Sequence, residues 1–154
     1  MVSTSVSVLV NGRSTEEFKL TRGLRQGDPL APFLFIIVVE GLAELARQAI
    51  KTNVLSGLKI GRNVIEVCML QFVNDTFFLC EDSYRNVITM KAILRGYELA
   101  SSLNVNFHKS KVVGINVERN VLDLYAKTLN CTQMLIPFKY LGLEVGGNPR
   151  RKRF

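Results

Sequence analysis

Residues Leu70–Leu79 read LQFVNDTFFL, and this stretch decides the fold. It belongs to two β-prone runs, Val67–Val73 and Thr76–Cys80, which are separated only by Asn74-Asp75. Asn and Asp tolerate the positive φ that a two-residue hairpin turn needs. The pattern therefore predicts a tight β-hairpin with Asn74-Asp75 at its tip.

An aspartate at such a tip is held by two strands. We expect the side chain of Asp75 to point off the sheet edge, where a metal ion and a phosphate can reach it. Two-metal phosphoryl transfer needs carboxylates clustered around ions about 3.5–4 Å apart. Taken alone, however, Asn74-Asp75 is better explained as turn chemistry, because both residue types are common in turns. The rest of the chain decides between the two interpretations.

Helices are predicted on both sides of this hairpin. Asp28-Pro29 marks a helix start, with Asp28 as N-cap and Pro29 in the first position, and this helix should run to about Lys51. Its apolar first half, Leu30–Val39, is too short to span a membrane and predicts a buried helix. Two more helices are predicted over Tyr84–Leu103, with Asn104 as the stop, and over Glu118–Leu129. The predicted helix stripes are Leu42, Leu45, Ala46 and Ala49 in the first helix, and Val87, Ile88, Ala92, Ile93 and Leu99 in the second.

Short strands account for most of the remaining chain. Asn11-Gly12 predicts a hairpin over 5–20, and 61–63 predicts the turn of another over 58–65. Residues 105–116 and 134–145 look extended, with a polar interruption in the first. This order predicts an α+β fold with a largely antiparallel sheet and helices on one face. We expect one domain over 1–147 and a basic tail over 148–154.

Composition excludes several classes of protein. The chain has 154 residues, of which 47% are hydrophobic, so a packed core is expected rather than disorder. The net charge of +7 favours polyanions such as nucleic acid, or an anionic membrane. More than half of this net charge comes from the tail. A solvated segment and a nucleic-acid contact both remain open as explanations of the tail. The residues concerned are Arg150, Arg151, Lys152 and Arg153.

The cysteines are three and widely spaced, and the one histidine is His108. This pattern argues against a zinc site and against a disulfide framework. Free thiols fit a reducing, intracellular compartment, nuclear or cytoplasmic. The N-terminus lacks the pattern of a signal peptide, and we expect no membrane partner.

Four segments resemble, in the family's order, the motifs of reverse transcriptases, particularly those of LINE-type non-LTR retrotransposons of plants. TRGLRQGDPLAPFLF (Thr21–Phe35) resembles the motif that grips template and nucleotide. LQFVNDTFFL resembles the F-A-D-D-T catalytic hairpin. LNVNFHKSK (Leu103–Lys111) resembles the N-x-x-K-S segment, and FKYLGLEVGGNPRR (Phe138–Arg151) resembles the Y-L-G primer grip. The resemblance covers essentially the whole chain and implies a partial polymerase palm, the catalytic subdomain.

The resemblance implies an RNA-directed DNA polymerase that uses Mg²⁺, an RNA template, a DNA primer and deoxynucleotides. It also assigns a role to each matching position. These are Arg25, Gln26 and Gly27 for nucleotide and template; Asn74, Asp75 and Lys109 for catalysis, with Asp75 as metal ligand; and Tyr140, Leu141 and Gly142 for the primer grip. Glycine and a helix N-terminus allow close approach of a phosphate, in line with the first group.

Simpler explanations stand beside some of these roles. Lys109 could be a surface lysine, Leu141 a core residue, and Gly142 a requirement of the backbone turn. We expect Asn106 to fix its loop through side-chain hydrogen bonds, and His108 to be solvent-exposed.

Two departures from the family pattern bear on activity. Asn74 stands where the family has the metal-holding aspartate, and Asp75 matches only the supporting one. A neutral amide lacks the charge on which Mg²⁺ sites are usually built. The family's other catalytic aspartate lies upstream of the RQGDP segment, and no aspartate precedes Asp28 in this chain.

We therefore expect a palm without its first strand and fingers, with an open sheet edge and no activity alone. A non-catalytic nucleic-acid-binding module and a degenerate retroelement remnant remain open as alternatives.

Overall fold

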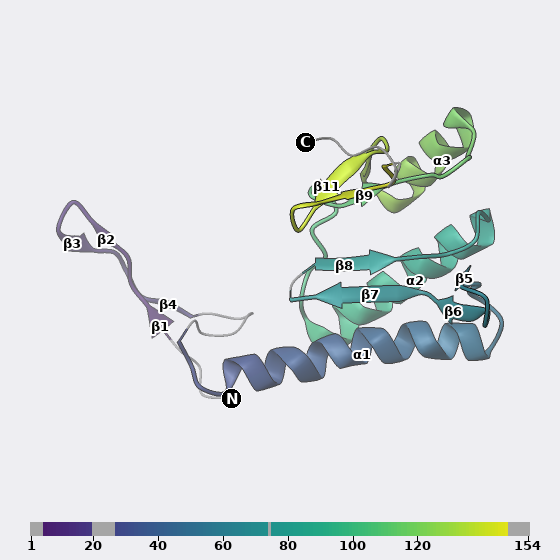
Figure 1. Cartoon of the computed structure of the whole chain (residues 1–154). Coiled ribbons are helices and arrows are strands. Elements are labelled where there is room, and N and C mark those ends of the chain that lie inside the picture. Colours follow the sequence, from purple (N-terminus) through teal and green to yellow (C-terminus); the bar gives the residue numbers. More distant parts are fainter. Residues whose placement is uncertain (1–4, 20–26, 74, 148–154) are drawn as a thin grey trace.

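The computed structural model describes residues 5–19, 27–73 and 75–147 (Figure 1). Within these residues the helices are α1 (Ala31–Lys51), α2 (Tyr84–Ser101) and α3 (Arg119–Leu129). The strands are β1 (Ser5–Val6), β2 (Leu9–Val10), β3 (Arg13–Ser14), β4 (Phe18–Lys19), β5 (Leu58–Ile60), β6 (Ile65–Val67), β7 (Met69–Phe72), β8 (Asp75–Phe78), β9 (Lys111–Val112), β10 (Thr132–Gln133), β11 (Phe138–Tyr140) and β12 (Leu143–Val145). The predicted α+β class is confirmed.

The strands pair two at a time. Five ladders are antiparallel, namely β1–β4, β2–β3, β5–β6, β7–β8 and β11–β12, while β9 and β10 pair in parallel across α3. Antiparallel pairing therefore dominates as predicted, but as separate two-stranded ladders. Each strand spans only two to four residues, which suits hairpins better than a wide sheet.

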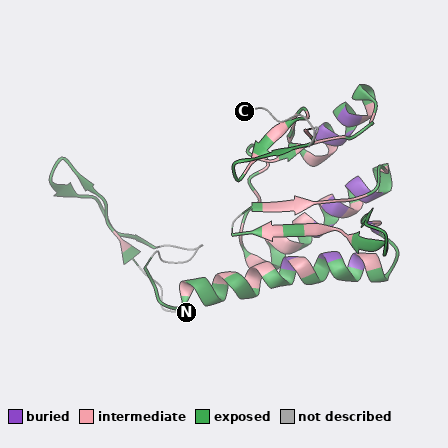
Figure 2. Cartoon of the chain, viewed as in Figure 1, coloured by how far each residue is buried: buried purple, intermediate pink, exposed green. Residues whose placement is uncertain are grey.

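The predicted N-terminal hairpin is confirmed. β2 and β3 are joined by Asn11 (φ 50°) and Gly12 (φ 79°), the pair of positive φ values that a two-residue hairpin turn requires. Figure 1 shows this hairpin standing apart from the three helices, and Figure 2 shows that its surface is exposed. It adds no buried residue to the core.

Helix α1 begins later than predicted. Asp28 Oδ1 accepts a 2.8 Å hydrogen bond from the Leu30 N–H, and its carbonyl accepts one of 3.0 Å from Ala31. Asp28 therefore caps a turn before the helix, and the first i→i+4 bond runs from Leu34 to Leu30. The prediction that Asp28 is the N-cap and Pro29 the first helical residue is wrong, and Pro32 lies in the first turn instead.

The core lies between the three helices and the inner side of the β7–β8 hairpin. Its buried members are Leu42, Ala49, Leu55, Val87, Met90, Ile93 and Tyr125. The predicted stripe of α1 is largely confirmed, because Leu42, Ala46 and Ala49 are buried, whereas Leu45 is exposed.

The first half of α1 is exposed, which corrects the prediction of a buried helix. The exposed fractions are 66% for Phe33, 63% for Ile36 and 67% for Ile37. Figure 1 shows this end of α1 extending beyond the β7–β8 hairpin, where the described residues offer it little cover. An apolar sequence therefore leaves an apolar surface here.

Helix α2 ends at Ser101, and Ser102 is its C-cap in the left-handed region (φ 59°), so the predicted stop at Asn104 is wrong. Its buried face also differs from the predicted stripe. Val87 and Ile93 are buried as expected, but Ile88, Ala92 and Leu99 are exposed. Asn86 and Met90 complete the buried face instead.

Asn86 can be buried because its polar atoms are satisfied. Its Oδ1 accepts a 3.0 Å hydrogen bond from the Ser56 N–H, and its Nδ2 donates one of 2.9 Å to the Glu81 carbonyl. These bonds tie the start of α2 to the loop after α1. A buried amide with partners on both sides is a stable arrangement.

The remaining predictions are mixed. The hairpin of β5 and β6 is confirmed, and α3 is confirmed with Glu118 as its N-cap. The extended segment predicted over 105–116 is mostly irregular, because only β9 forms there.

Candidate functional site

The β7–β8 hairpin turns one residue earlier than predicted. Phe72 pairs with Asp75, so that Asp75 is the first residue of β8 and not part of the turn. Position 74, the site of Asn74, lies outside the described residues. Val73 enters the turn with φ 49°, a conformation that is strained for a β-branched residue. The predicted tip at Asn74-Asp75 is therefore wrong.

This register decides which way Asp75 points. Residues directly opposite each other share a face of the ladder, so Asp75 lies on the same face as Phe72, Leu70 and Phe77. The other face carries Met69 and Phe78, which pack against the core. Asp75 thus projects from the outer face of the hairpin rather than off the sheet edge, and its residue is exposed.

The β11–β12 hairpin packs on this outer face. The rings of Phe77 and Tyr140 meet edge-on, with centroids 4.4 Å apart and an interplanar angle of 80°. The ring of Phe138 lies 6.5 Å from that of Phe77 and is nearly parallel to it, at 17°. The structure therefore brings two predicted site segments together, the catalytic hairpin and the primer-grip hairpin.

Tyr140 lies within electrostatic reach of Asp75. Burial raises the pKa of the Tyr140 hydroxyl, and the negative charge of Asp75 raises this pKa further. The phenol therefore remains neutral and protonated at physiological pH.

Leu141 and Gly142 form the turn between β11 and β12. Their φ values are 49° and 80°, and the space around the Gly142 Cα is open. Leu141 is 55% exposed, so the explanation of it as a core residue is wrong. Gly142 is confirmed as a turn residue. The contact of either residue with a primer stays a prediction.

The loop that holds Lys109 is fixed as predicted by Asn106. The Lys109 N–H donates to both the carbonyl and Oδ1 of Asn106, at 3.1 Å each, and the Ser110 hydroxyl donates to the same carbonyl at 2.9 Å. His108 is exposed, as predicted. The Lys109 side chain is exposed as well, and no contact among the described residues joins it to Asp75.

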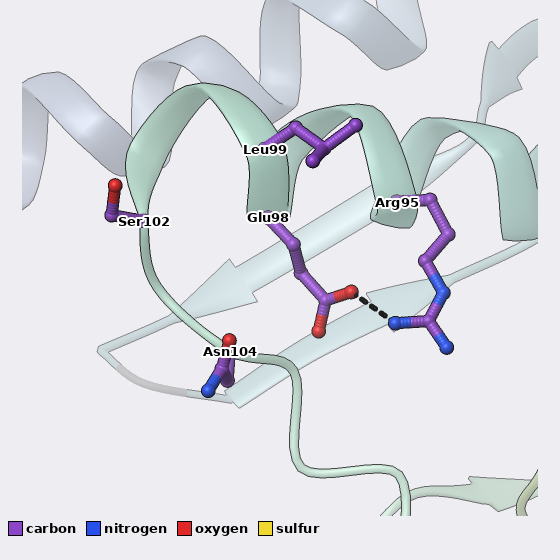
Figure 3. Close-up of a pocket in the computed structure, with 5 residues that line it drawn as sticks. All are labelled: Arg95, Glu98, Leu99, Ser102 and Asn104. Carbon is purple, nitrogen blue, oxygen red and sulfur yellow. Dashed lines mark hydrogen bonds and ion pairs between the residues drawn. The ribbon is translucent and has the colours of Figure 1, made fainter.

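A groove that sequence reasoning missed lies between α2 and this loop. The groove is open to solvent, has a volume of about 780 Å³, and is lined among others by Arg95, Glu98, Phe107 and His108. It adjoins a smaller pocket of about 350 Å³, which Figure 3 shows. Arg95 pairs with Glu98 at 2.6 Å and stacks over the Phe107 ring at 5.1 Å. The charge of Arg95 is thus balanced by Glu98, and Glu98 Oε1 also accepts a 2.8 Å hydrogen bond from the Val105 N–H, which ties the loop to α2. The i,i+3 spacing of Arg95 and Glu98 was the available signal.

Of the three residues predicted to contact nucleotide and template, the structure describes Gly27. Gly27 has φ 86°, and nothing lies within 4 Å of the position of a Cβ. Its backbone is therefore open to close approach, in line with the predicted role. Arg25 and Gln26 lie outside the described residues.

The donor set falls short of a metal site. Within 5–19, 27–73 and 75–147, no group of three or more His, Cys, Asp or Glu side chains could hold a metal ion. Asp75 is a single carboxylate with aromatic neighbours, whereas Mg²⁺ is usually bound through carboxylates and substrate phosphates. The described residues therefore do not fit a metal centre by themselves.

The β7–β8 and β11–β12 hairpins thus lie in contact on an α+β scaffold. Residues 1–145 match the family model described as "Reverse transcriptase (RNA-dependent DNA polymerase)". The chain therefore belongs to the reverse transcriptase family. Enzymes of this family use divalent metal ions and work on a nucleic-acid template and primer.

Two curated relatives agree with this family. The chain is 30% identical over 138 residues to a retrovirus-related Pol polyprotein from the type-1 retrotransposable element R2 of Popillia japonica, covering 85% of this chain and 19% of the relative. It is 40% identical over 68 residues to an uncharacterised mitochondrial protein of Arabidopsis thaliana, covering 44% of this chain and 56% of the relative. The chain thus spans about a fifth and about half of these relatives. In the described part of the chain, no helix has the length and hydropathy needed to cross a membrane.

Proposed function

We propose that this chain is a portion of a reverse-transcriptase palm that holds the end of a primer on a template, and that it does not polymerise by itself. The observation that supports this function is the contact between its two site hairpins. Asp75 and Phe77 share the outer face of β8, and Tyr140 packs on Phe77. An exposed carboxylate, a phenol and a tight turn then lie along one surface.

The partners we propose are an RNA template and a DNA primer. Tyr140 and the backbone of the Leu141-Gly142 turn would lie against the primer strand. Gly27 and its neighbours Arg25 and Gln26 would meet template or nucleotide. Phosphate contacts dominate the affinity of such complexes and make it fall with salt. The net charge of +7 is in line with this kind of binding.

Catalysis by this chain alone is not proposed. Asp75 is the one carboxylate of the catalytic hairpin, since position 74 is an asparagine. A single carboxylate gives Mg²⁺ little to bind besides substrate phosphates. We infer that productive Mg²⁺ binding would need carboxylates from outside these 154 residues. We also propose an intracellular location, on the basis of three unpaired thiols.

The test is cross-linking from a primer terminus. An RNA–DNA hybrid with 4-thiothymidine at the primer 3′ end would be bound to the chain, irradiated, and the adducts mapped by mass spectrometry. The proposal expects adducts concentrated in 138–145. Adducts spread over the surface, or absent from that segment, would contradict it.

A tail variant separates the proposal from its main alternative. In the control, all four tail cations are changed to glutamine: Arg150, Arg151, Lys152 and Arg153. If the chain is only a basic binding module, this variant should lose both affinity and cross-links. If the proposal holds, the salt dependence of binding becomes shallower while the adducts in 138–145 persist.

A further inference from the structure

Phe77 lies at the junction of the two site hairpins, and the proposed function assigns it no contact with nucleic acid. Its ring contacts Tyr140 edge-on at 4.4 Å and faces Phe138 at 6.5 Å. Edge-to-face and offset parallel pairs are the preferred geometries of aromatic rings. One side chain of β8 thus meets both aromatic residues of β11.

No backbone ladder among the described strands joins these hairpins. β7 pairs with β8, and β11 pairs with β12, as two separate ladders. Hydrogen bonds between strands therefore do not fix the position of one hairpin on the other. Among the described residues, the ring contacts of Phe77 with Phe138 and Tyr140 join the two hairpins.

Strand geometry then relates Phe77 to Asp75. The two residues are two apart on β8, so both side chains lie on the outer face, about 7 Å apart along the strand. Phe138 and Tyr140 are likewise two apart on β11 and share one face. Docking β11 on Phe77 therefore places Tyr140 over the face that carries Asp75, within electrostatic reach of this carboxylate.

We propose that Phe77 is a positioning residue, whose ring docks the β11–β12 hairpin on the outer face of β7–β8 and keeps Tyr140 beside Asp75. The inference rests on the proposed function only for the purpose of this docking, which is to let both hairpins contact the same primer strand. The docking itself requires no nucleic acid.

The test reads the surroundings of Tyr140 by ¹⁹F NMR. The chain has four tyrosines, so labelling with 3-fluorotyrosine gives four signals, and Tyr140→Phe identifies that of Tyr140. Spectra are taken at one neutral pH. In the otherwise unchanged chain, Asp75→Asn should shift the Tyr140 signal. In a Phe77→Leu background, the signal should move to the position of an exposed tyrosine, and Asp75→Asn should no longer shift it.

Phe78 provides the matched control. It is the next residue of the same strand and the same type, but it packs against the core on the opposite face. Phe78→Leu should lower stability and yet keep the response of Tyr140 to Asp75→Asn. Phe77→Trp, which retains an aromatic ring and adds no tyrosine signal, should keep the response as well. If Phe77→Leu does not fold, Phe138→Leu tests the same contact and should weaken the response.

Two results would overturn the inference. One is a Phe77→Leu variant in which Asp75→Asn still shifts Tyr140 in full. The other is an equal loss of response in Phe78→Leu, which would indicate general loosening rather than positioning. Neither result depends on nucleic acid. The cross-linking test of the proposed function can therefore fail while the docking of the hairpins holds, and the docking can fail while the cross-linking succeeds.

Discussion

The hydroxyl of Tyr125 donates a 2.7 Å hydrogen bond to Oδ1 of Asp82, and this bond ties α3 to the segment just before α2. Tyr125 is 8% exposed and belongs to the core cluster. Burial, followed by the hydrogen bond to Asp82, raises the pKa of Tyr125 to about 12. The contact between α3 and this segment thus depends on the proton of the Tyr125 hydroxyl.

Tyr125→Phe should lower the free energy of unfolding by about 1–2 kcal/mol at neutral pH, because the hydrogen bond to a carboxylate is lost. A phenol whose pKa is raised by folding stabilises the fold at pH values below its ordinary pKa of 10. This contribution disappears as the pH rises from about 10 to about 12. Urea unfolding across this range should therefore show a steeper loss in the parent chain than in the variant. Equal slopes would show that Tyr125 is not the group responsible. Tyr84→Phe, at a residue that is 48% exposed, is the control.

Val73→Gly should stabilise the chain by about 0.5–1 kcal/mol. A β-branched residue at φ 49° destabilises the fold by roughly 1–2 kcal/mol. Glycine removes this strain, but part of the gain is offset because glycine loses more backbone entropy on folding. Chemical denaturation measures the difference. Val67→Gly, within β6, should destabilise instead. A loss of stability in Val73→Gly would mean that the turn does not adopt this conformation.

Asn86→Leu should lower the free energy of unfolding by about 2–3 kcal/mol, because the Ser56 N–H would lose its acceptor. This loss is expected although leucine is similar in size and the site is 97% buried. Thermal unfolding measures this loss. The exposed Asn63→Leu should change stability by less than about 0.5 kcal/mol. A neutral effect at Asn86 would show that water replaces the amide there.

Phe33→Ser and Ile37→Ser together should reduce the fluorescence of a hydrophobic dye bound to the folded chain and leave the free energy of unfolding nearly unchanged. Both side chains are about two-thirds exposed, so little packing is lost. Leu42→Ser is the matched change at a buried position of the same helix, and it should cost about 3 kcal/mol or more. Strong destabilisation by the surface pair would mean that this half of α1 is packed.

The unchanged chain should show no primer extension on an RNA template with Mg²⁺ or Mn²⁺. Asn74→Asp alone should not rescue extension, because the tested chain has no aspartate before Asp28. Incorporation of labelled deoxynucleotide is compared with a reaction without protein. Metal-dependent incorporation by either chain would show that the metal ligands lie elsewhere.

Locally determined features could be predicted from the sequence. Asn11-Gly12 has the residues that its turn requires, and the apolar spacing of 119–129 is enough to predict α3. Features that depend on tertiary packing could not. The buried face of α2 rotates to include Asn86, because the loop after α1 supplies partners for an amide that a hydrophobic pattern cannot anticipate.

The candidate site was predicted in its segments but not in its geometry. Residue types at Asn74-Asp75 favoured a turn there, yet the pairing of Phe72 with Asp75 prevailed over that local preference. The contact of Tyr140 with Phe77 joins segments far apart in the sequence, and no periodicity in either strand predicts it. Resemblance gave their order along the chain, while packing decides their distance.

The separation of the strands into two-stranded ladders has a consequence for how the chain reaches its native state. Four of these ladders, β2–β3, β5–β6, β7–β8 and β11–β12, join neighbouring strands through short turns, and such hairpins close within microseconds. The parallel pair of β9 and β10 encloses α3, so its loop-closure entropy is larger. We expect the hairpins to form early and this parallel pair to close last, when α3 has already docked. Refolding should therefore be limited by the last third of the chain rather than by the β7–β8 hairpin.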